Sequence, residues 1–226
     1  MMRNRTAVMA VVLLVVATLS AEAQVQEKQW QVVVGGGYQS FGSGAAVDPG
    51  AVLSGEANYF FSDVLALGLY TDFIFTQTAG NELIPAALNF VDSTTFTFVN
   101  QALEIFQYGV QTKVRLPRNF SPFALLGVGG YTAFFDPQQN NGNSNSTRWM
   151  MKFGVGVDLA VSSGAGFQLS VQDSWYPNWD PTALLPVRPQ FQNTQFPELN
   201  PDQSELSTSV HNFSFKAAFT LVPGAL

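Results

Sequence analysis

The stretch FQYGVQTKVRLP, residues 106–117, alternates between two kinds of side chain. Its even-numbered positions are apolar or compatible with lipid, from Phe106 to Leu116, whereas its odd-numbered positions are polar or glycine and include Lys113 and Arg115. A period of two residues predicts a β-strand whose two faces meet different surroundings. One face of this strand is suited to an apolar environment, and the other carries two full positive charges.

The same alternation recurs along the chain, and turn residues separate its repeats. Within residues 24–226 we find neither an apolar run long enough for a spanning helix nor a useful stripe of period 3.6. The pattern therefore predicts an all-β protein with eight strands. The expected strands cover residues 30–39, 53–61, 65–76, 106–117, 123–135, 151–159, 167–175 and 212–221.

The connections between the expected strands alternate in length. Residues 62–63, 117–121 and 162–166 form tight turns, and the longer connections are polar or rich in Pro and Asn. An even strand number with short connections at one end and long ones at the other predicts an eight-stranded antiparallel up-and-down transmembrane β-barrel. Both termini then lie on the periplasmic side, with the short turns. The long connections are residues 43–50, 77–100, 136–147 and 177–206.

The composition and the N-terminus agree with export to a membrane. Only 12 % of the 226 residues are charged, against about 25 % in ordinary soluble domains. Cysteine is absent, and the net charge of −6 argues against a nucleic-acid partner. Arg3 and Arg5 precede an apolar run that is too short to span a bilayer, and Ala21-Glu22-Ala23 follows as a cleavage pattern. We therefore expect a cleaved signal peptide at 1–23 and one barrel domain at 24–226, with an uncleaved anchor as the alternative.

Three segments carry a resemblance to a known family: WQVVVGGGY (30–38), FGVGVDLAVSSGAGFQLSVQDSWYP (153–177) and HNFSFKAAFTL (211–221). Together with the signal peptide they resemble the small bacterial outer-membrane β-barrel proteins of the OmpA/OmpX type. The resemblance implies a monomer in the cell outer membrane, in contact with its lipids and inserted by the barrel assembly machinery. Family members usually end on an aromatic residue, whereas this chain continues past Leu221 as VPGAL.

Inward-facing charges are the main candidate site. In hydrocarbon a sheet must close on itself to pair its backbone groups, and eight strands enclose just enough space for side chains. We expect the charges to form a network that closes the pore, with a narrow ion pathway as the alternative. We expect Glu56 to pair with Lys216, and Lys113 and Asp158 either to form a neighbouring pair or to join the same network. The predicted lumen network contains Glu56, Asp72, Lys113, Arg115, Lys152, Asp158 and Lys216.

Aromatic residues near the strand ends are a second candidate group. Trp30, Trp149, Trp175 and Tyr176 are expected to form a girdle at the level of the lipid headgroups. The long connection 177–206 mixes Pro, acidic and aromatic residues, and long ordered loops are often functional. We expect it to pack over the barrel mouth and to be the place where an extracellular ligand or surface partner would bind.

Catalysis finds little support in the sequence. His211 is the only histidine, with Ser209 two residues before it and Glu205 nearby, but this order is the reverse of the His-x-Ser order of outer-membrane lipid deacylases. We therefore expect no enzyme activity, no cofactor and no metal, and a structural or surface-interaction role. The alternatives are porin-like transport and a soluble lipocalin-like barrel that binds an apolar ligand inside. The direction in which the apolar side chains face distinguishes the last of these.

Overall fold

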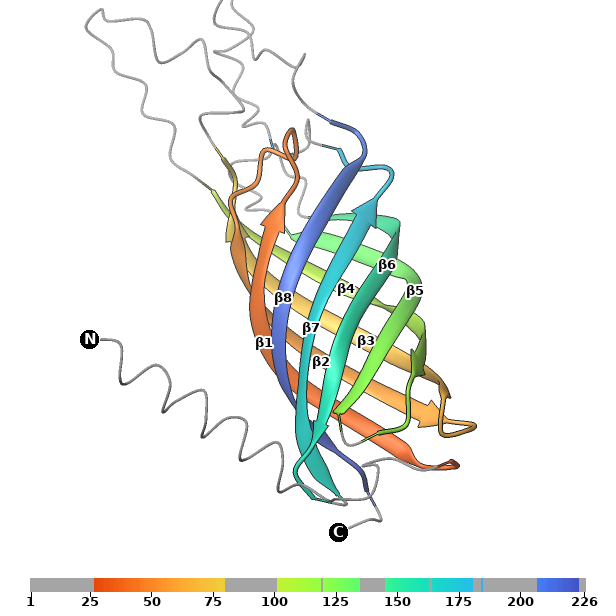
Figure 1. The fold of residues 1–226 in the computed structure, drawn as a ribbon. Helices are drawn as coiled ribbons and strands as arrows, with labels where there is room; N and C mark the ends of the chain where they lie inside the picture. The colour runs from red at the N-terminus through yellow and green to blue at the C-terminus, as the bar shows by residue number, and fades with distance from the viewer. Residues whose placement is uncertain are drawn as a thin grey trace, which may run out of the picture.

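The computed structural model describes residues 27–79, 101–118, 120–134, 145–162, 164–180, 184 and 207–223. These residues form a closed barrel in which each strand pairs antiparallel with the next and β8 pairs with β1 (Figure 1). The predicted all-β fold with eight strands is confirmed. The strands are β1 (Trp30–Phe41), β2 (Gly50–Phe60), β3 (Leu65–Gln77), β4 (Ala102–Arg115), β5 (Phe120–Phe134), β6 (Asn145–Ala160), β7 (Ala165–Tyr176) and β8 (Val210–Leu221).

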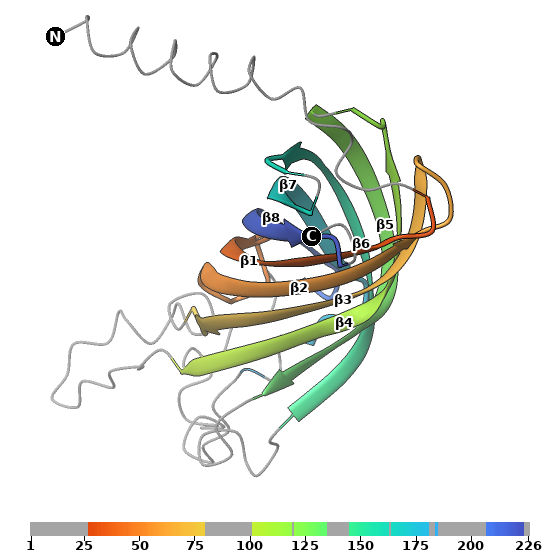
Figure 2. The same cartoon turned by 90° about the horizontal axis from the view of Figure 1, so that it is seen from below.

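The strands are strongly tilted around the barrel axis (Figure 2). Paired residues followed from Leu221 through β1 and the successive strands return to β8 at His211, ten residues away from the start. Such a stagger is what closes eight tilted strands into a narrow barrel. We call the end with the short connections the turn end, where β1 begins and β8 ends, and the opposite end the loop end.

Most strands begin earlier than the alternation predicted, and the difference is largest for β4 and β6. β4 starts at Ala102, and its first inward residues, Leu103 and Ile105, are buried and apolar. β6 starts at Asn145, and the first residues of this strand are polar but pair with the end of β5. The expected starts at 106 and 151 were late because both segments depart from the pattern of apolar residues outside and polar residues inside.

The outer face of the barrel is apolar and the inner face is largely polar. Leu69 and Phe219 are 62 % and 63 % exposed on the outside, whereas Lys113 and Lys152 are fully buried inside. This is the opposite of a soluble barrel that binds an apolar ligand in its lumen, so the lipocalin-like alternative is wrong. The described residues contain no helix long and apolar enough to cross a membrane.

Two inward glycines make room for large aromatic side chains. A Cβ at Gly109 would lie 2.8 Å from the Tyr70 hydroxyl, and one at Gly156 would lie 2.5 Å from the Phe123 ring. Large residues packed against glycines are how a narrow barrel reaches a dense interior.

Candidate functional site

The centre of the lumen holds one carboxylate between two lysines. Asp72 of β3 forms ion pairs with Lys152 of β6, on the opposite wall, and with Lys216 of β8, at 2.6 Å. The ammonium group of Lys152 also lies 3.7 Å from the centre of the Tyr70 ring. All four side chains are buried. Two of the three charges in this group are cationic, and both cations form an ion pair with the same anion, Asp72.

Glu56 does not form the expected ion pair with Lys216. Its carboxylate instead accepts hydrogen bonds from the amides of Gln111, at 2.9 Å, and Asn58, at 3.3 Å. Lys216 reaches past β1 and β2 to Asp72, which is within range of its long side chain and is already the partner of Lys152. Glu56 and Lys216 lie at a similar number of residues from the turn end of their strands. Sequence position could not, however, choose among several anions within reach of one lysine.

A second ion pair lies nearer the turn end and agrees with the sequence-based expectation. Lys113 of β4 lies 2.8 Å from Asp158 of β6. Its ammonium group also donates to the side-chain oxygens of Gln168, at 2.8 Å, and Gln31, at 3.1 Å. One carboxylate and two amide oxygens therefore surround this buried ammonium group.

At the turn end of the lumen, an apolar cluster is formed by the buried residues Phe60, Ala66 and Val222. Arg115 covers this cluster from inside, with its guanidinium 4.3 Å from the centre of the Phe60 ring and its Nε donating to the carbonyl of Asp63 at 2.9 Å. Val222 follows β8, and its N–H donates to the carbonyl of Gly164. The residue just past Leu221 is thus buried as part of this cluster.

Stacked aromatic rings lie at the loop end of the lumen, and this corrects one predicted role. Tyr176 faces the lumen and is fully buried, so it does not belong to the girdle. Its ring stacks on Tyr131 at 4.0 Å and contacts Trp179 at 5.6 Å. Its hydroxyl accepts a hydrogen bond from Gln107. Because Trp175 faces outward, the two-residue period already required Tyr176 to face inward.

The described part of the fourth long connection packs into this end of the barrel. Trp179 is 4 % exposed, and its indole N–H donates to the carbonyl of Ala45 at 2.9 Å. Leu184 is also buried, while the rest of 181–206 lies outside the described residues. The alternation of the sequence did not predict that the lumen would be apolar at its loop end. This cluster contains Ala45, Ala46, Val47, Val52, Ile74, Leu103, Ile105, Tyr131, Ala133, Met150, Tyr176, Trp179, Leu184 and Val210.

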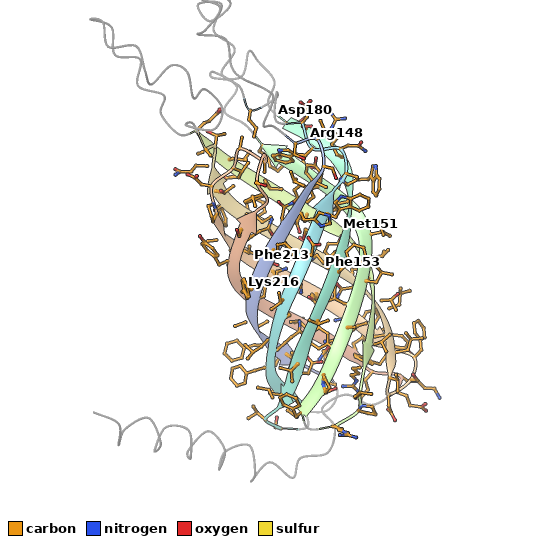
Figure 3. The ribbon with its side chains drawn as sticks, turned by 45° about the horizontal axis from the view of Figure 1, so that its top comes forward. Arg148, Met151, Phe153, Asp180, Phe213 and Lys216 are labelled. Atoms are coloured by element: carbon orange, nitrogen blue, oxygen red, sulfur yellow. The ribbon has the colours of Figure 1, made fainter. Side chains whose placement is uncertain are left out.

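The three predicted girdle tryptophans all lie on the outer face. Trp30 is at the turn end and half exposed, and it contacts Tyr59. Trp149 and Trp175 lie near the loop end with ring centres 5.9 Å apart. Arg148 and Asp180 form a partly exposed ion pair at the same rim (Figure 3).

His211 lies next to these rings but has no nucleophile as its partner. Its Nδ1 is 2.7 Å from a carboxylate oxygen of Asp173, and its ring stacks on Trp175. The hydroxyl of Ser209 instead accepts a hydrogen bond from Trp175, and Glu205 lies outside the described residues. Among the described residues there is also no group of three or more His, Asp or Glu that could hold a metal ion.

The fold and its filled interior define a small membrane-spanning β-barrel. Its lipid-facing wall is apolar, and its lumen contains ion pairs between two apolar clusters. The chain matches the family of the outer membrane protein beta-barrel domain over residues 10–219, and it belongs to this family. Its location is therefore the cell outer membrane.

Solved structures with the same fold are distant in sequence. Neisserial surface protein A is 11 % identical with a TM-score of 0.52, over 85 % of this chain and 96 % of that chain. OprG from Pseudomonas aeruginosa is 14 % identical with a TM-score of 0.51, over 89 % of this chain and 99 % of that chain. A comparison with curated proteins gave no match. At these identities the likeness supports the fold and not a shared ligand.

Proposed function

We propose that this protein is a closed, non-enzymatic outer-membrane barrel with a structural or surface-interaction role. The observation that carries the proposal is the sequence of layers along the lumen. The aromatic cluster around Tyr131, Tyr176 and Trp179 fills the loop end, and Phe60, Ala66 and Val222 fill the turn end. Between them the lysines are held by carboxylates and amides. An ion crossing the lumen would have to break buried ion pairs, which costs about 3–5 kcal/mol each.

We propose the following steps for export, membrane insertion and the final oligomeric state. The signal peptide at 1–23 is removed on export, the barrel assembly machinery inserts residues 24–226, and the product is a monomer. Trp30, Trp149 and Trp175 hold the barrel at the two membrane interfaces, since amphipathic rings favour the headgroup level. Their outward orientation near strand ends supports this role.

Surface interaction is assigned to the loop end and chiefly to residues 177–206. Trp179 and Leu184 anchor the beginning of this connection in the apolar cluster, so it is attached to a rigid base. Binding residues often lie on loops that a rigid scaffold positions. A surface partner would then meet a preorganised start of the loop rather than a fully free chain.

Conductance measurements test the closed state. Purified protein in planar bilayers is expected to show no stable channels, because two apolar clusters and the central network all block the lumen. The triple variant W179A/Y176A/Y131A is expected to remain closed, because the network around Asp72 lies below the cluster it removes. Large, steady channels in the wild-type protein contradict the proposal. A small, ion-selective conductance that changes with Lys216→Met would favour the narrow pathway instead.

A further inference from the structure

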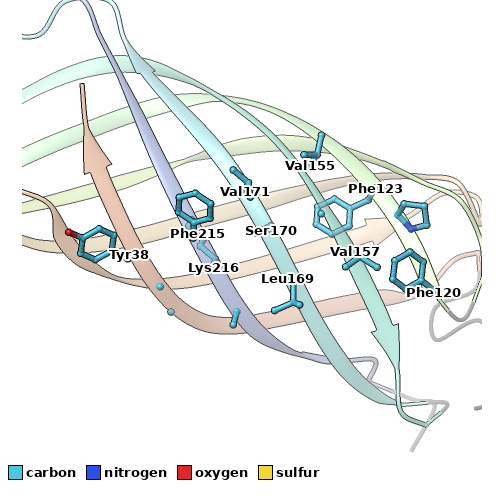
Figure 4. Close-up of a pocket in the computed structure, with 15 residues that line it drawn as sticks. Tyr38, Phe120, Phe123, Val155, Val157, Leu169, Ser170, Val171, Phe215 and Lys216 are labelled. Carbon is cyan, nitrogen blue, oxygen red and sulfur yellow. The ribbon is translucent and has the colours of Figure 1, made fainter. Parts of the chain in front are cut away.

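The outer wall of the barrel has shallow gaps between neighbouring rows of side chains, and Tyr38, Phe215 and Leu169 border one of them (Figure 4). The side chains that face lipid there are aliphatic or aromatic, and none of them selects one occupant. At the loop end, by contrast, three consecutive carbonyl groups of the connection between β1 and β2 each accept a hydrogen bond from a distant part of the chain. These carbonyls belong to residues 44–46, which we call the joint.

The joint holds both ends of the fourth long connection. The carbonyl of Gly44 accepts a hydrogen bond from the backbone N–H of Ser207 at 2.9 Å. The carbonyl of Ala45 accepts one from the indole N–H of Trp179, also at 2.9 Å. The backbone N–H of Trp179 donates to the carbonyl of Thr208 at 2.9 Å, so the two ends are joined to each other as well. Any movement that turns the carbonyls of the joint away therefore releases both ends together.

The last residue of the joint, Ala46, ties it to the barrel. Its carbonyl accepts a hydrogen bond from the N–H of Ala79 at 2.9 Å, just after the end of β3. Val47 then forms an antiparallel bridge with Thr78, beyond the paired residues of β2 and β3. The chain on the C-terminal side of Ala46 is therefore fixed to the sheet, whereas the chain on its N-terminal side carries the two acceptors for the fourth connection.

The backbone at Ala46 is strained. Its φ is 56°, and only one other non-glycine residue among those described has a positive φ. In this left-handed region the Cβ comes close to the following carbonyl oxygen, which makes the conformation unfavourable for alanine. Rotation about φ of Ala46 turns the peptide group that contains the Ala45 carbonyl relative to the sheet. A relaxed Ala46 would therefore carry the acceptors of the joint away from Ser207 and Trp179.

We propose that the joint is a two-state element that holds or releases both ends of the fourth long connection, and that the strain at Ala46 sets the balance between the two states. In the held state the strain is offset by the burial of Ala45 and Ala46 in the apolar cluster and by the hydrogen bonds to the connection. In the released state Ala46 has a negative φ and both ends are detached from the joint. A surface partner that contacts the held connection shifts the balance towards the held state. This last step rests on the surface-interaction role proposed above, whereas the two states exist without a partner.

Hydrogen exchange of the folded protein in lipid nanodiscs, followed by NMR, measures how often the ends detach. The reporters are the backbone N–H of Ser207 and the indole N–H of Trp179, which both donate directly to the joint. Ala46→Gly and Ala45→Gly each remove a buried methyl group from the same cluster and add backbone freedom, but only Ala46→Gly relieves a positive φ. Both reporters are therefore expected to exchange about tenfold more slowly in Ala46→Gly than in Ala45→Gly, because relief of the left-handed alanine favours the held state by about that factor.

Ala46→Val is the opposite change, because a β-branched residue is still less compatible with a positive φ. Both reporters should then exchange about tenfold faster than in the wild-type protein, or more. Ala133→Val is the matched control, since it adds the same two methyl groups to the same cluster from β5 and is expected to leave both reporters near their wild-type rates. The amide of Asp48 donates to Gln77 on the sheet side of the joint and should keep its wild-type rate in every variant.

Three results overturn the proposal. Equal exchange in Ala46→Gly and Ala45→Gly would show that the strain does not set the balance. A change at one reporter without the other would show that the two ends detach independently. Acceleration of the Asp48 amide together with the reporters would show that the whole connection between β1 and β2 unfolds. Heat-modifiable gel migration checks that each variant is folded, and the glycine pair decides the proposal even where Ala46→Val does not fold. Channel conductance tests the closed barrel separately, so the two proposals can fail independently.

Discussion

Removal of the Asp72 charge should be among the most damaging single changes in the lumen. In Asp72→Asn the shape of the side chain stays nearly the same, but Lys152 and Lys216 both lose their ion pair in a buried position. Removing one partner of a buried pair costs about 3–5 kcal/mol. We expect a loss of free energy of unfolding at the upper end of that range, about 5 kcal/mol, because two cations are left without this partner.

A double-mutant cycle separates the two pairings that Lys216 could make. Lys216→Met added to Asp72→Asn should restore part of the stability, because it removes one orphaned cation. The coupling energy is expected to be about 1–3 kcal/mol. The matched cycle of Glu56→Gln with Lys216→Met should be additive within about 0.5 kcal/mol, since no ion pair joins them.

Urea unfolding of the barrel in thin-bilayer vesicles, followed by tryptophan fluorescence and extrapolated linearly to water, gives the four free energies of each cycle. The reasoning is refuted if Glu56 couples to Lys216 and Asp72 does not. It is also refuted if Asp72→Asn costs less than about 1 kcal/mol, the range of an exposed pair.

The remaining predictions concern packing. Trp179→Ala removes a buried indole and its hydrogen bond to Ala45; the amides of residues 178–180 should then exchange hydrogen much faster while those of the barrel strands stay protected, and unchanged exchange would show that Trp179 is not the anchor. Gly156→Ala should reduce the folded fraction on a heat-modifiable gel, because the new Cβ would lie 2.3 Å from the carbonyl oxygen of Leu169. Gly55→Ala is the control, since its nearest neighbouring atom is 3.5 Å away, and equal behaviour of the two variants would contradict the steric argument.

The alternation of the sequence predicts facing well but does not predict contacts. Within one strand, a period of two fixes the face of every residue once the face of one residue is known. Lys113 and Arg115 were therefore correctly placed inside from residues 106–117 alone. Which anion a lysine meets depends on the stagger of the closed barrel and on the reach of a flexible side chain. The alternation contains neither quantity, so the pairing of Lys113 with Asp158 could be expected while that of Lys216 was assigned to the wrong carboxylate.

The composition of the lumen was predicted only for its middle part. Charged and amide side chains do occupy that part, but the upper lumen is apolar because the fourth long connection covers it with Trp179. A strand segment such as Leu103 to Ile105 then has apolar residues on the inside, which reverses the pattern used to recognise strands. A loop that folds back onto a barrel allows apolar residues at the inward positions that it covers. The residues of such a loop lie far away in the sequence from the strand residues that they contact.

The glycine run at 35–37 lies in β1, where the neighbouring strands approach too closely to leave room for side chains. A Cβ at Gly35 or Gly37 would lie 2.3 Å or 1.9 Å from a carbonyl oxygen of β8, and one at Gly36 would lie 2.8 Å from the carbonyl of Val52 on β2. Side chains there would therefore push β1 away from both of its partners. In hydrocarbon each backbone group left unpaired costs several kcal/mol, so β1 must stay close to β2 and β8 for the barrel to close.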